Sequence, residues 1–396
     1  MGERSGVTVI TAPVGPQPVL DEEALFREAR RLRARRWTIG ILTVAALLTV
    51  GAAIAALASS GGGTPASGGG AGTAGGLPTG ALARLRVAGA LAVGRNGALY
   101  VTDVAGDRVL VRLPDGRFRV VVGNGKVGFA GDGGPAVDAD LSDVSELAFS
   151  PDGSLYIVDG GRVRVVSPNG VIRTIAGDGR APAGRSPRPI ANGTPALSAA
   201  LGSPRSLAAS GSPPSIALSP SGQLYLSTFS QLLRLTAAGT LDTIRAVVPS
   251  GPWAGNLDAN LGPIAIDAQG NLDVAGVNGW SIWQLPPSGV AHQVGFGADG
   301  QARRSGGNVS LLERGPDGAV YGENGNIILR VEGNRLVPTF AFNQYFWLTH
   351  LAFGPQGTLY ADEIPGGEAF EAHQQLVSVR NAHVSLLWQE NNTTPK

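Results

Sequence analysis

The sequence contains no cysteine, and its one methionine is the first residue. Without cysteine the chain can form no disulfide bond, no thiolate metal site and no cysteine-based active site. Charge is scarce and balanced, with 15% charged residues and a formal net charge of +1, which argues against general nucleic-acid binding. Functions that depend on thiols or on a strongly basic surface are therefore excluded.

Charged residues are also missing from one long stretch near the N-terminus. No charged side chain occurs from Trp37 to Ala83, and Thr38–Ala58 is almost wholly apolar. A helix of this length spans about 30 Å, the thickness of the hydrocarbon core of a bilayer. We therefore expect a single transmembrane helix at 37–58, with residues 1–36 in the cytoplasm and the rest of the chain outside. This orientation follows from six arginines that precede the apolar run, at positions 27, 30, 31, 33, 35 and 36.

The end of the apolar run allows a second interpretation. Ala56-Leu57-Ala58 fits the cleavage site of a signal peptide, although the length of the run and of the segment before it favours an uncleaved anchor. Residues 59–80 consist mainly of Gly, Ser and Ala and cannot bury a core. They predict a flexible linker between the anchor and a globular region that begins at residue 81.

Glycine, in contrast, is abundant, with 59 residues, which is roughly twice ordinary usage. Much of it belongs to a repeated signature of Gly, a variable residue, an aliphatic residue and usually Tyr. Successive copies lie 39 to 69 residues apart and read GALY (97–100), GSLY (153–156), GQLY (222–225), GNLD (270–273), GAVY (318–321) and GTLY (357–360). Periods near 40–50 residues with strand-like units are typical of a β-propeller.

Each repeat contains the same four strand-like segments. An apolar strand precedes the signature and three strands follow it, with Pro-Asp-Gly, Pro-Asn-Gly or Pro-Ser-Gly triplets that suit tight hairpin turns. We therefore predict an all-β, six-bladed β-propeller of four-stranded blades at 81–390, followed by a tail at 391–396. The last unit has four candidate strands of its own, so ring closure needs no strand exchange, although Leu82–Val87 could pair at the seam.

The segments between the repeats share a further motif. Residues 131–136 read GDGGPA and are followed by Ala139 and Leu141, and a weaker copy begins with NGTPA at 192–196. With these motifs the region from about residue 89 to 390 resembles the NHL-repeat family of β-propellers, in which such segments connect one blade to the next. The resemblance implies a rigid recognition platform, and in some bacterial membrane proteins an external sensor domain.

The connector at 123–141 also invites two chemical interpretations. Its Gly123-Asn124-Gly125-Lys126 lacks the Ser or Thr and the following helix of a phosphate-binding loop. Asp138, Asp140 and Asp143 could contribute to a calcium site, but Asp143 stands where a calcium loop of the EF-hand type requires glycine. A blade-to-blade connector is the favoured interpretation, with calcium retained as the alternative and no other cofactor expected.

Alignment of the repeats on the signature glycine places the innermost strands side by side. One column contains small residues and a single exception: Ala92, Ala148, Ala217, Ala265, Glu313 and Ala352. Two residues earlier stand Ala90, Glu146, Ser215, Pro263, Leu311 and His350. Because the innermost strands of a propeller surround its axis, we predict a polar ligand-binding site at the channel mouth from Glu146, Ser215, Glu313 and His350. No catalytic residue can be assigned from spacing alone.

These features together predict a function in binding. We expect a single-pass cell-membrane protein whose extracytoplasmic propeller binds a protein, a peptide or a cell-envelope ligand, with a possible cytoplasmic partner at Arg27–Arg36. An enzyme is the less favoured expectation. It would be a metal-dependent hydrolase or lyase, similar to lactonase propellers, with its site at the propeller axis. The fold alone does not decide between the two functions.

Overall fold

The structure is a computed structural model of the chain of 396 residues. It describes residues 76–180, 189–202, 215–228, 231–245, 247–248, 255–256, 261–276, 282–296, 309, 311–324, 327–342, 346–365, 374–381 and 383–390. The expected cytoplasmic segment with Arg27–Arg36, the expected transmembrane helix at 37–58 and the tail at 391–396 lie outside these residues. Among the residues it does describe, none form a helix with the length and apolarity that crossing a bilayer requires.

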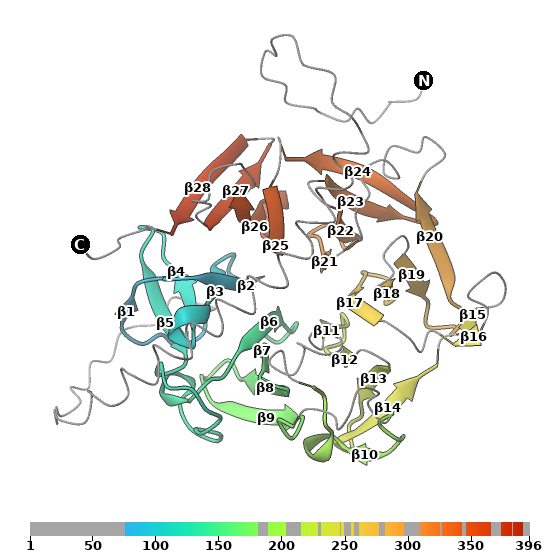
Figure 1. The fold of residues 1–396 in the computed structure, drawn as a ribbon, viewed down its shortest axis with the longest axis horizontal. Helices are drawn as coiled ribbons and strands as arrows, with labels where there is room; N and C mark the ends of the chain where they lie inside the picture. The colour runs from blue at the N-terminus through green and yellow to red at the C-terminus, as the bar shows by residue number, and fades with distance from the viewer. Residues whose placement is uncertain are drawn as a thin grey trace, which may run out of the picture. The chain divides into compact units, whose positions relative to one another are not determined.

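The described strands form six antiparallel blades around a common centre, which confirms the predicted all-β, six-bladed propeller (Figure 1). The first three blades are β2 (Ala88–Val93) to β5 (Phe118–Val122) with β3 (Leu99–Asp103) and β4 (Arg108–Arg112); β6 (Val144–Phe149), β7 (Leu155–Asp159), β8 (Arg162–Val166) and β9 (Ile172–Ala176); and β11 (Ser215–Leu218), β12 (Leu224–Ser227), β13 (Leu232–Leu235) and β14 (Thr240–Ile244).

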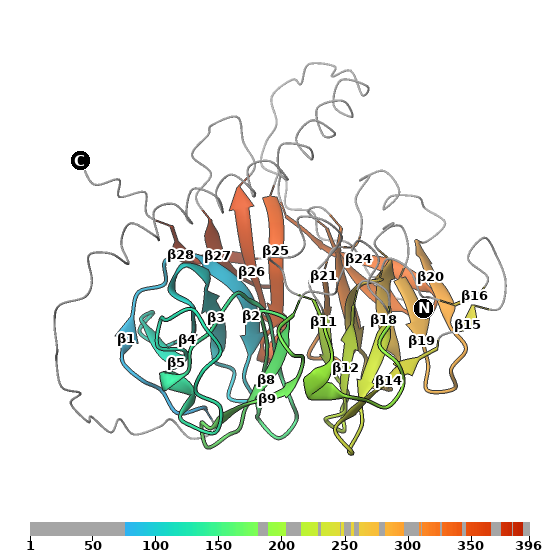
Figure 2. The same cartoon turned by 60° about the horizontal axis from the view of Figure 1, so that its bottom comes forward.

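The other three blades follow in chain order around the ring. They are β17 (Leu261–Ile266), β18 (Leu272–Gly276), β19 (Ile282–Leu285) and β20 (His292–Phe296); β21 (Leu311–Arg314), β22 (Val320–Asn324), β23 (Ile327–Glu332) and β24 (Arg335–Ala341); and β25 (Phe346–Phe353), β26 (Leu359–Pro365), β27 (Gln375–Arg380) and β28 (His383–Gln389). The first strand of every blade lies innermost and contacts the first strands of both neighbours (Figure 1). The ring is closed because β2 contacts β25, and Figure 2 shows these two strands side by side.

The turn before each second strand explains why the signature begins with glycine. All six signature glycines have a positive φ, a conformation that side chains other than glycine rarely adopt; the values are 78° at Gly97, 90° at Gly153, 83° at Gly222, 85° at Gly270, 81° at Gly318 and 75° at Gly357. The repeated glycine is therefore a requirement of the tight turn between the first two strands.

The signature tyrosines supply the packing between neighbouring blades. The ring of Tyr100 in blade 1 meets Phe149 in blade 2 edge-on at 4.8 Å, and Tyr321 in blade 5 lies 4.7 Å from Phe353 in blade 6. Tyr100 is only 2% exposed. Burying an aromatic side chain of this kind contributes about 1.5–3 kcal/mol, and an aromatic pair adds roughly 0.5–1.5 kcal/mol. The repeat thus places the same kind of packing contact at two of the blade interfaces.

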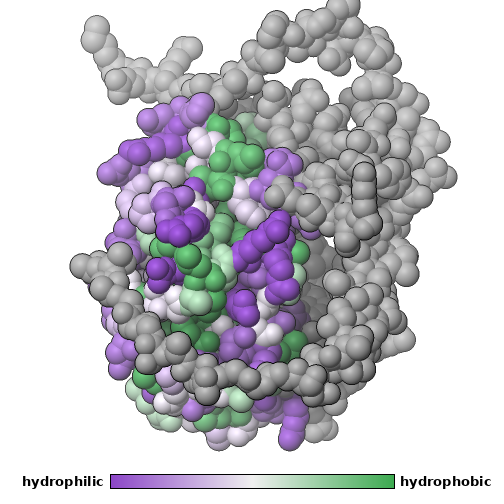
Figure 3. Space-filling model, turned by 90° about the vertical axis from the view of Figure 1, so that its left-hand side faces the viewer, coloured by the Kyte–Doolittle hydropathy of each residue, from purple (hydrophilic) through white to green (hydrophobic). Residues whose placement is uncertain are grey.

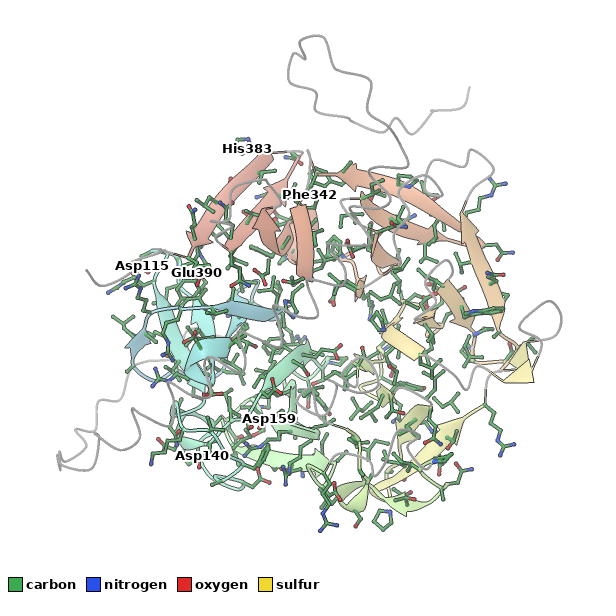
Figure 4. The ribbon with its side chains drawn as sticks, viewed as in Figure 1. Asp115, Asp140, Asp159, Phe342, His383 and Glu390 are labelled. Atoms are coloured by element: carbon green, nitrogen blue, oxygen red, sulfur yellow. The ribbon has the colours of Figure 1, made fainter. Side chains whose placement is uncertain are left out.

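The glycine-rich stretch 123–141 is held as the connector between blades 1 and 2. Arg164 of β8 is fully buried and donates to Asp132 in this stretch (2.8 Å) and to the carbonyl oxygen of Asp140 (2.7 Å). The same guanidinium pairs with the buried carboxylate of Asp159 at the end of β7 (3.2 Å). Figure 4 labels Asp140 and Asp159 on the same side of the ring. The connector is therefore clamped to blade 2 by one buried arginine.

Segments that precede a blade also extend its outer edge. The short strand β1 (Leu82–Ala83) pairs with β5, and β10 (Thr194–Pro195) pairs with β14. The first connector does the same for blade 2, because Gly133 donates to the carbonyl oxygen of Ile172 (2.8 Å) in β9. We expected that Leu82–Val87 could pair at the seam between the last and first blades, and this was wrong. Leu82 and Ala83 pair with β5 at the outer edge of blade 1.

The outer edges of blades 4, 5 and 6 are arranged differently. The outermost strands of blades 4 and 5 pair in parallel, with Gly295 opposite Arg335, and join these blades into one sheet. In blade 6, β28 is the edge strand, with exposed Val384 and Leu386. Figure 3 shows this side of the molecule, where apolar residues form a band between hydrophilic ones. A groove of about 670 Å³ lies at the seam between Phe118 and Trp388.

Candidate functional site at the centre of the ring

The pairing of the strands confirms the sequence alignment of the repeats. The first column of the innermost strands lies opposite the signature tyrosine, or Asp273, in every blade: Ala92 with Tyr100, Ala148 with Tyr156, Ala217 with Tyr225, Ala265 with Asp273, Glu313 with Tyr321 and Ala352 with Tyr360. Glu146, Ser215 and His350 stand two residues earlier on their own strands. All four predicted site residues therefore belong to the innermost layer.

Glu146 and Ser215 are brought into direct contact. The hydroxyl group of Ser215 donates to Oε1 of Glu146 (3.1 Å), and the backbone N–H of Ile216 donates to Oε2 (2.9 Å). Ser215 in turn accepts a hydrogen bond from the backbone N–H of Ile264 (3.2 Å). One carboxyl group and one hydroxyl group thus link the innermost strands of blades 2, 3 and 4.

Glu313 is the second carboxyl group of this central layer. Both acids are partly exposed, but the protein atoms packed around them cause a desolvation that raises the pKa of Glu146 to about 8 and that of Glu313 to about 8. Hydrogen bonds from Ile216 and Ser215 oppose the shift at Glu146, whereas the charge of Glu313 adds to it. At neutral pH both groups are therefore mainly protonated, so each presents an O–H donor together with a carbonyl acceptor.

His350 takes part in a different set of contacts. Its Nδ1 lies 3.4 Å from Oδ2 of Asp362, a fully buried carboxyl group on β26. The same oxygen accepts hydrogen bonds from the hydroxyl of Thr349 (2.6 Å) and from Nε2 of Gln374 (2.8 Å). Gln374 also bonds to the backbone of Ala88 in blade 1, so His350 belongs to the network that closes the ring.

The sequence interpretation missed the residues that hold this network and the connector. Asp159 and Asp362 are buried on second strands, and Arg164 is fully buried on β8. The signal for Asp159 was available, because an aspartate ends the second strand in both YVTD (100–103) and YIVD (156–159). Asp103 plays the equivalent part in blade 1, where it accepts from the backbone N–H of Arg86 (3.1 Å).

The side chain of Asp140, one of the expected calcium residues, is engaged within the connector. Oδ1 of Asp140 accepts a hydrogen bond from Nδ2 of Asn124 (2.7 Å), and the same amide donates to the carbonyl oxygen of Asp138 (2.8 Å). Within the described ranges no group of three or more His, Asp or Glu side chains is placed to hold a metal ion.

Comparison with known proteins identifies the repeats. The family model of the Teneurin NHL domain matches residues 114–210, which cover the last strand of blade 1, all of blade 2 and both connector motifs. This part of the chain is therefore similar to an NHL-repeat domain. The match agrees with the connector motifs, and the NHL propeller fold is compatible with binding to proteins.

Several solved structures are similar to the chain at low sequence identity. A streptogramin B lyase is 12% identical with a TM-score of 0.47, covering 77% of this chain and 86% of that chain. Virginiamycin B lyase from Staphylococcus aureus is 13% identical with a TM-score of 0.46 (76% and 84% covered), and a gluconolactonase from Xanthomonas campestris is 12% identical with a TM-score of 0.44 (70% and 83%). No curated protein matches the chain. Similarity this low supports no assignment of an activity.

Proposed function

We propose that this NHL-repeat propeller is a recognition module, tethered to the cell membrane by residues 37–58 and displayed outside the cytoplasm. Its ligand is a protein, a peptide or a cell-envelope component held on a propeller face or at the centre of the ring. The observation that carries the proposal is the contact between Glu146 and Ser215 on neighbouring innermost strands, with Glu313 within electrostatic range.

The chemistry of these residues suits recognition. Mainly protonated Glu146 and Glu313 offer both donors and acceptors, as the amides and hydroxyls of peptides and glycans require. The scaffold around them is rigid, because the innermost strands form a closed ring, so little ordering is needed on binding.

The membrane part of the proposal is supported by the sequence. An apolar run of bilayer length follows six arginines, a charge pattern that retains the N-terminal side in the cytoplasm. In this arrangement Arg27–Arg36 is the segment through which a cytoplasmic partner would sense occupancy of the propeller.

A binding comparison tests the function. The 396-residue chain, purified in detergent micelles, is presented with panels of cell-envelope glycans and peptides, and the dissociation constant of each bound compound is measured. The variants Glu146→Ala and Ser215→Ala should weaken binding by about tenfold or more, the effect of losing a buried hydrogen bond. Asp115→Ala, an exposed residue on a blade 1 turn, is the matched control (Figure 4).

Two results would overturn the proposal. One is binding that the central substitutions leave unchanged. The other is stoichiometric calcium or zinc in the purified chain together with lactone or ester hydrolysis that Glu146→Gln abolishes, since that result identifies the metal-dependent hydrolase instead.

A further inference from the structure

Blade 4 departs from the repeat at one packing position. Asp273 replaces the signature tyrosine, and it lies opposite Ala265 as the tyrosines lie opposite their partners. The signature tyrosine packs against the next blade, on the residue that follows the small residue of the innermost strand. That residue is Phe149 for Tyr100 and Phe353 for Tyr321. At the interface of blades 4 and 5 that position holds Arg314. The interface of blades 4 and 5 therefore has charged residues at the two positions that carry aromatic pairs at two other interfaces.

A polar cavity of about 460 Å³ lies at this interface. It is bordered by the turns between the first and second strands of both blades and by the turn after β23 of blade 5, and its rim includes the exposed residues Asp317 and Gly333. The parallel pairing of β20 with β24 joins the two blades at their outer edge. The turns that border the cavity therefore connect strands of one continuous sheet.

Asp273, one of the residues that line this cavity, carries an unsatisfied acceptor. The side chain is fully buried, and its Oδ1 accepts a hydrogen bond from Nε2 of Gln284 (3.0 Å). Its Oδ2 has no hydrogen-bond partner. A buried polar atom without a partner is rare and costs about 1–3 kcal/mol. A ligand that donates a hydrogen bond would remove this cost.

The other charged groups in the lining are already engaged within the protein. Asp267 accepts from the backbone N–H groups of Gln269 (2.9 Å) and Asn271 (2.8 Å). Asp317 accepts from Nε of Arg330 (2.9 Å), and that arginine also pairs with Glu332. Carboxylates outnumber the one arginine of the lining, so the cavity favours positive charge.

We propose that the cavity between blades 4 and 5 binds an organic cation, a guanidinium or primary ammonium group, whose N–H donates to Oδ2 of Asp273. Gln284 orients the carboxylate by holding its other oxygen, and Gln269 and Asn271 line the approach. The cation is carried either by a small molecule or by an arginine or lysine side chain of a peptide.

This inference deepens the proposed function, because it names the ligand chemistry of one propeller face. Its test is independent of the centre of the ring, because none of Glu146, Ser215 and Glu313 lines the cavity. If the unsubstituted chain binds a ligand at the centre of the ring but binds no small cation, only the cation site is rejected and the proposed function stands.

The experiment is a titration of the 396-residue chain with n-butylguanidinium and n-butylammonium chloride, with n-butanol as the neutral control. Burial raises the pKa of Asp273 to about 8, and the charge of Asp267 adds to the shift, so the titration is run above that pH. The side-chain amide resonance of Gln284 reports occupancy in the unsubstituted chain. A capped peptide with one central arginine distinguishes the two sources of the cation. If the site takes an arginine side chain of a peptide, this peptide should bind at least as tightly as n-butylguanidinium; if it takes a free small molecule, the peptide should bind more weakly.

We expect saturable binding of at least one cation, a shift of the Gln284 amide resonance and no response to butanol. Asp273→Asn should weaken binding by about tenfold or more, and Asp273→Glu should retain most of it. Asp152→Asn is the control, because it also removes one carboxylate, from the turn before the second strand of blade 2. In that blade the signature position holds Tyr156, so binding should be unchanged. Absence of saturation and of a Gln284 shift in the unsubstituted chain would overturn the proposal, as would equal binding to Asp273→Asn.

Discussion

The side-chain amide of Gln374 forms a pair of hydrogen bonds with the backbone of Ala88, 286 positions away in the sequence. Oε1 accepts from the N–H of Ala88 (2.9 Å), and Nε2 donates to its carbonyl oxygen (2.8 Å). In this way a side chain of blade 6 satisfies both backbone groups at the start of the innermost strand of blade 1. The contact joins the first and last blades, between which none of the described strands is exchanged.

Replacing Gln374 should therefore weaken the closure of the ring. We expect Gln374→Ala to lower the free energy of unfolding by roughly 2–4 kcal/mol, because it leaves both backbone groups of Ala88 and the buried Asp362 without this partner. Urea unfolding monitored by tryptophan fluorescence provides the measurement. Gln356→Ala, an exposed glutamine of the same blade, should change stability little; equal effects of the two variants would contradict the assigned closure.

Arg164 should be the most sensitive residue of the connector. Arg164→Met removes the partner of the buried Asp159 and of Asp132, and we expect a loss of about 3 kcal/mol or more. Limited proteolysis should then cut within residues 123–141 much faster than in the unsubstituted chain. Arg173→Met, an exposed arginine on β9, is the control, and proteolysis that is equally slow in both variants would show that the clamp is dispensable.

The two central carboxyl groups should make stability depend on pH. Their pKa values rise from the ordinary 4.5 to about 8 in the folded chain. As pH rises between these values, the unfolded chain loses protons that the folded chain retains, so stability is highest below the lower value and is lost as pH approaches the upper one. Glu146→Gln should therefore raise the free energy of unfolding at pH 8 by roughly 1–3 kcal/mol and have little effect at acidic pH.

Denaturant unfolding at a series of pH values tests this expectation. Glu390→Gln is the matched control, because this residue lies at the outer side of the ring (Figure 4). Stability that rises between pH 5 and pH 8, or a Glu146→Gln variant with the same pH profile as the unsubstituted chain, would rule out protonated acids at the centre.

The absence of cysteine allows a direct test of the proposed topology. Single cysteines introduced by Ser5→Cys and by Asp115→Cys are exposed to a membrane-impermeant maleimide on intact cells. We expect labelling at position 115 without permeabilisation and at position 5 only after it. The reverse pattern would place the propeller in the cytoplasm and remove the basis for an extracytoplasmic ligand.

The sequence repeats made the fold predictable, because residues within each repeat determine where its turns and strands lie. Signature glycines with a positive φ mark the turns, and the tyrosines after them mark the second strands. The short pairing of Leu82 and Ala83 with β5 was not predictable, because an edge strand of two residues carries no periodicity of its own. The parallel contact of β20 with β24 depends on the spatial approach of two edges, which local sequence does not encode.

For the candidate site, the sequence predicted which residues lie on the innermost strands but not which of them contact one another. Alignment placed Glu146, Ser215, Glu313 and His350 on the innermost strands, but which of them meet depends on side-chain direction in three dimensions. Glu146 reaches Ser215 across a blade boundary, whereas His350 turns to Asp362 within its own blade. Asp273 was recognised in the sequence only as an exception to the tyrosine, because its unsatisfied oxygen becomes evident only with the burial of the side chain.

The way the ring closes also bears on how such a chain can evolve. The described strands of every blade come from one continuous segment of sequence, and among them the last blade borrows none from the first. A gene segment that encodes one blade with its preceding connector could therefore be duplicated or removed without splitting a sheet between the two ends of the gene. The joined outer edges of blades 4 and 5 are the exception, so these two blades would be inherited as a pair.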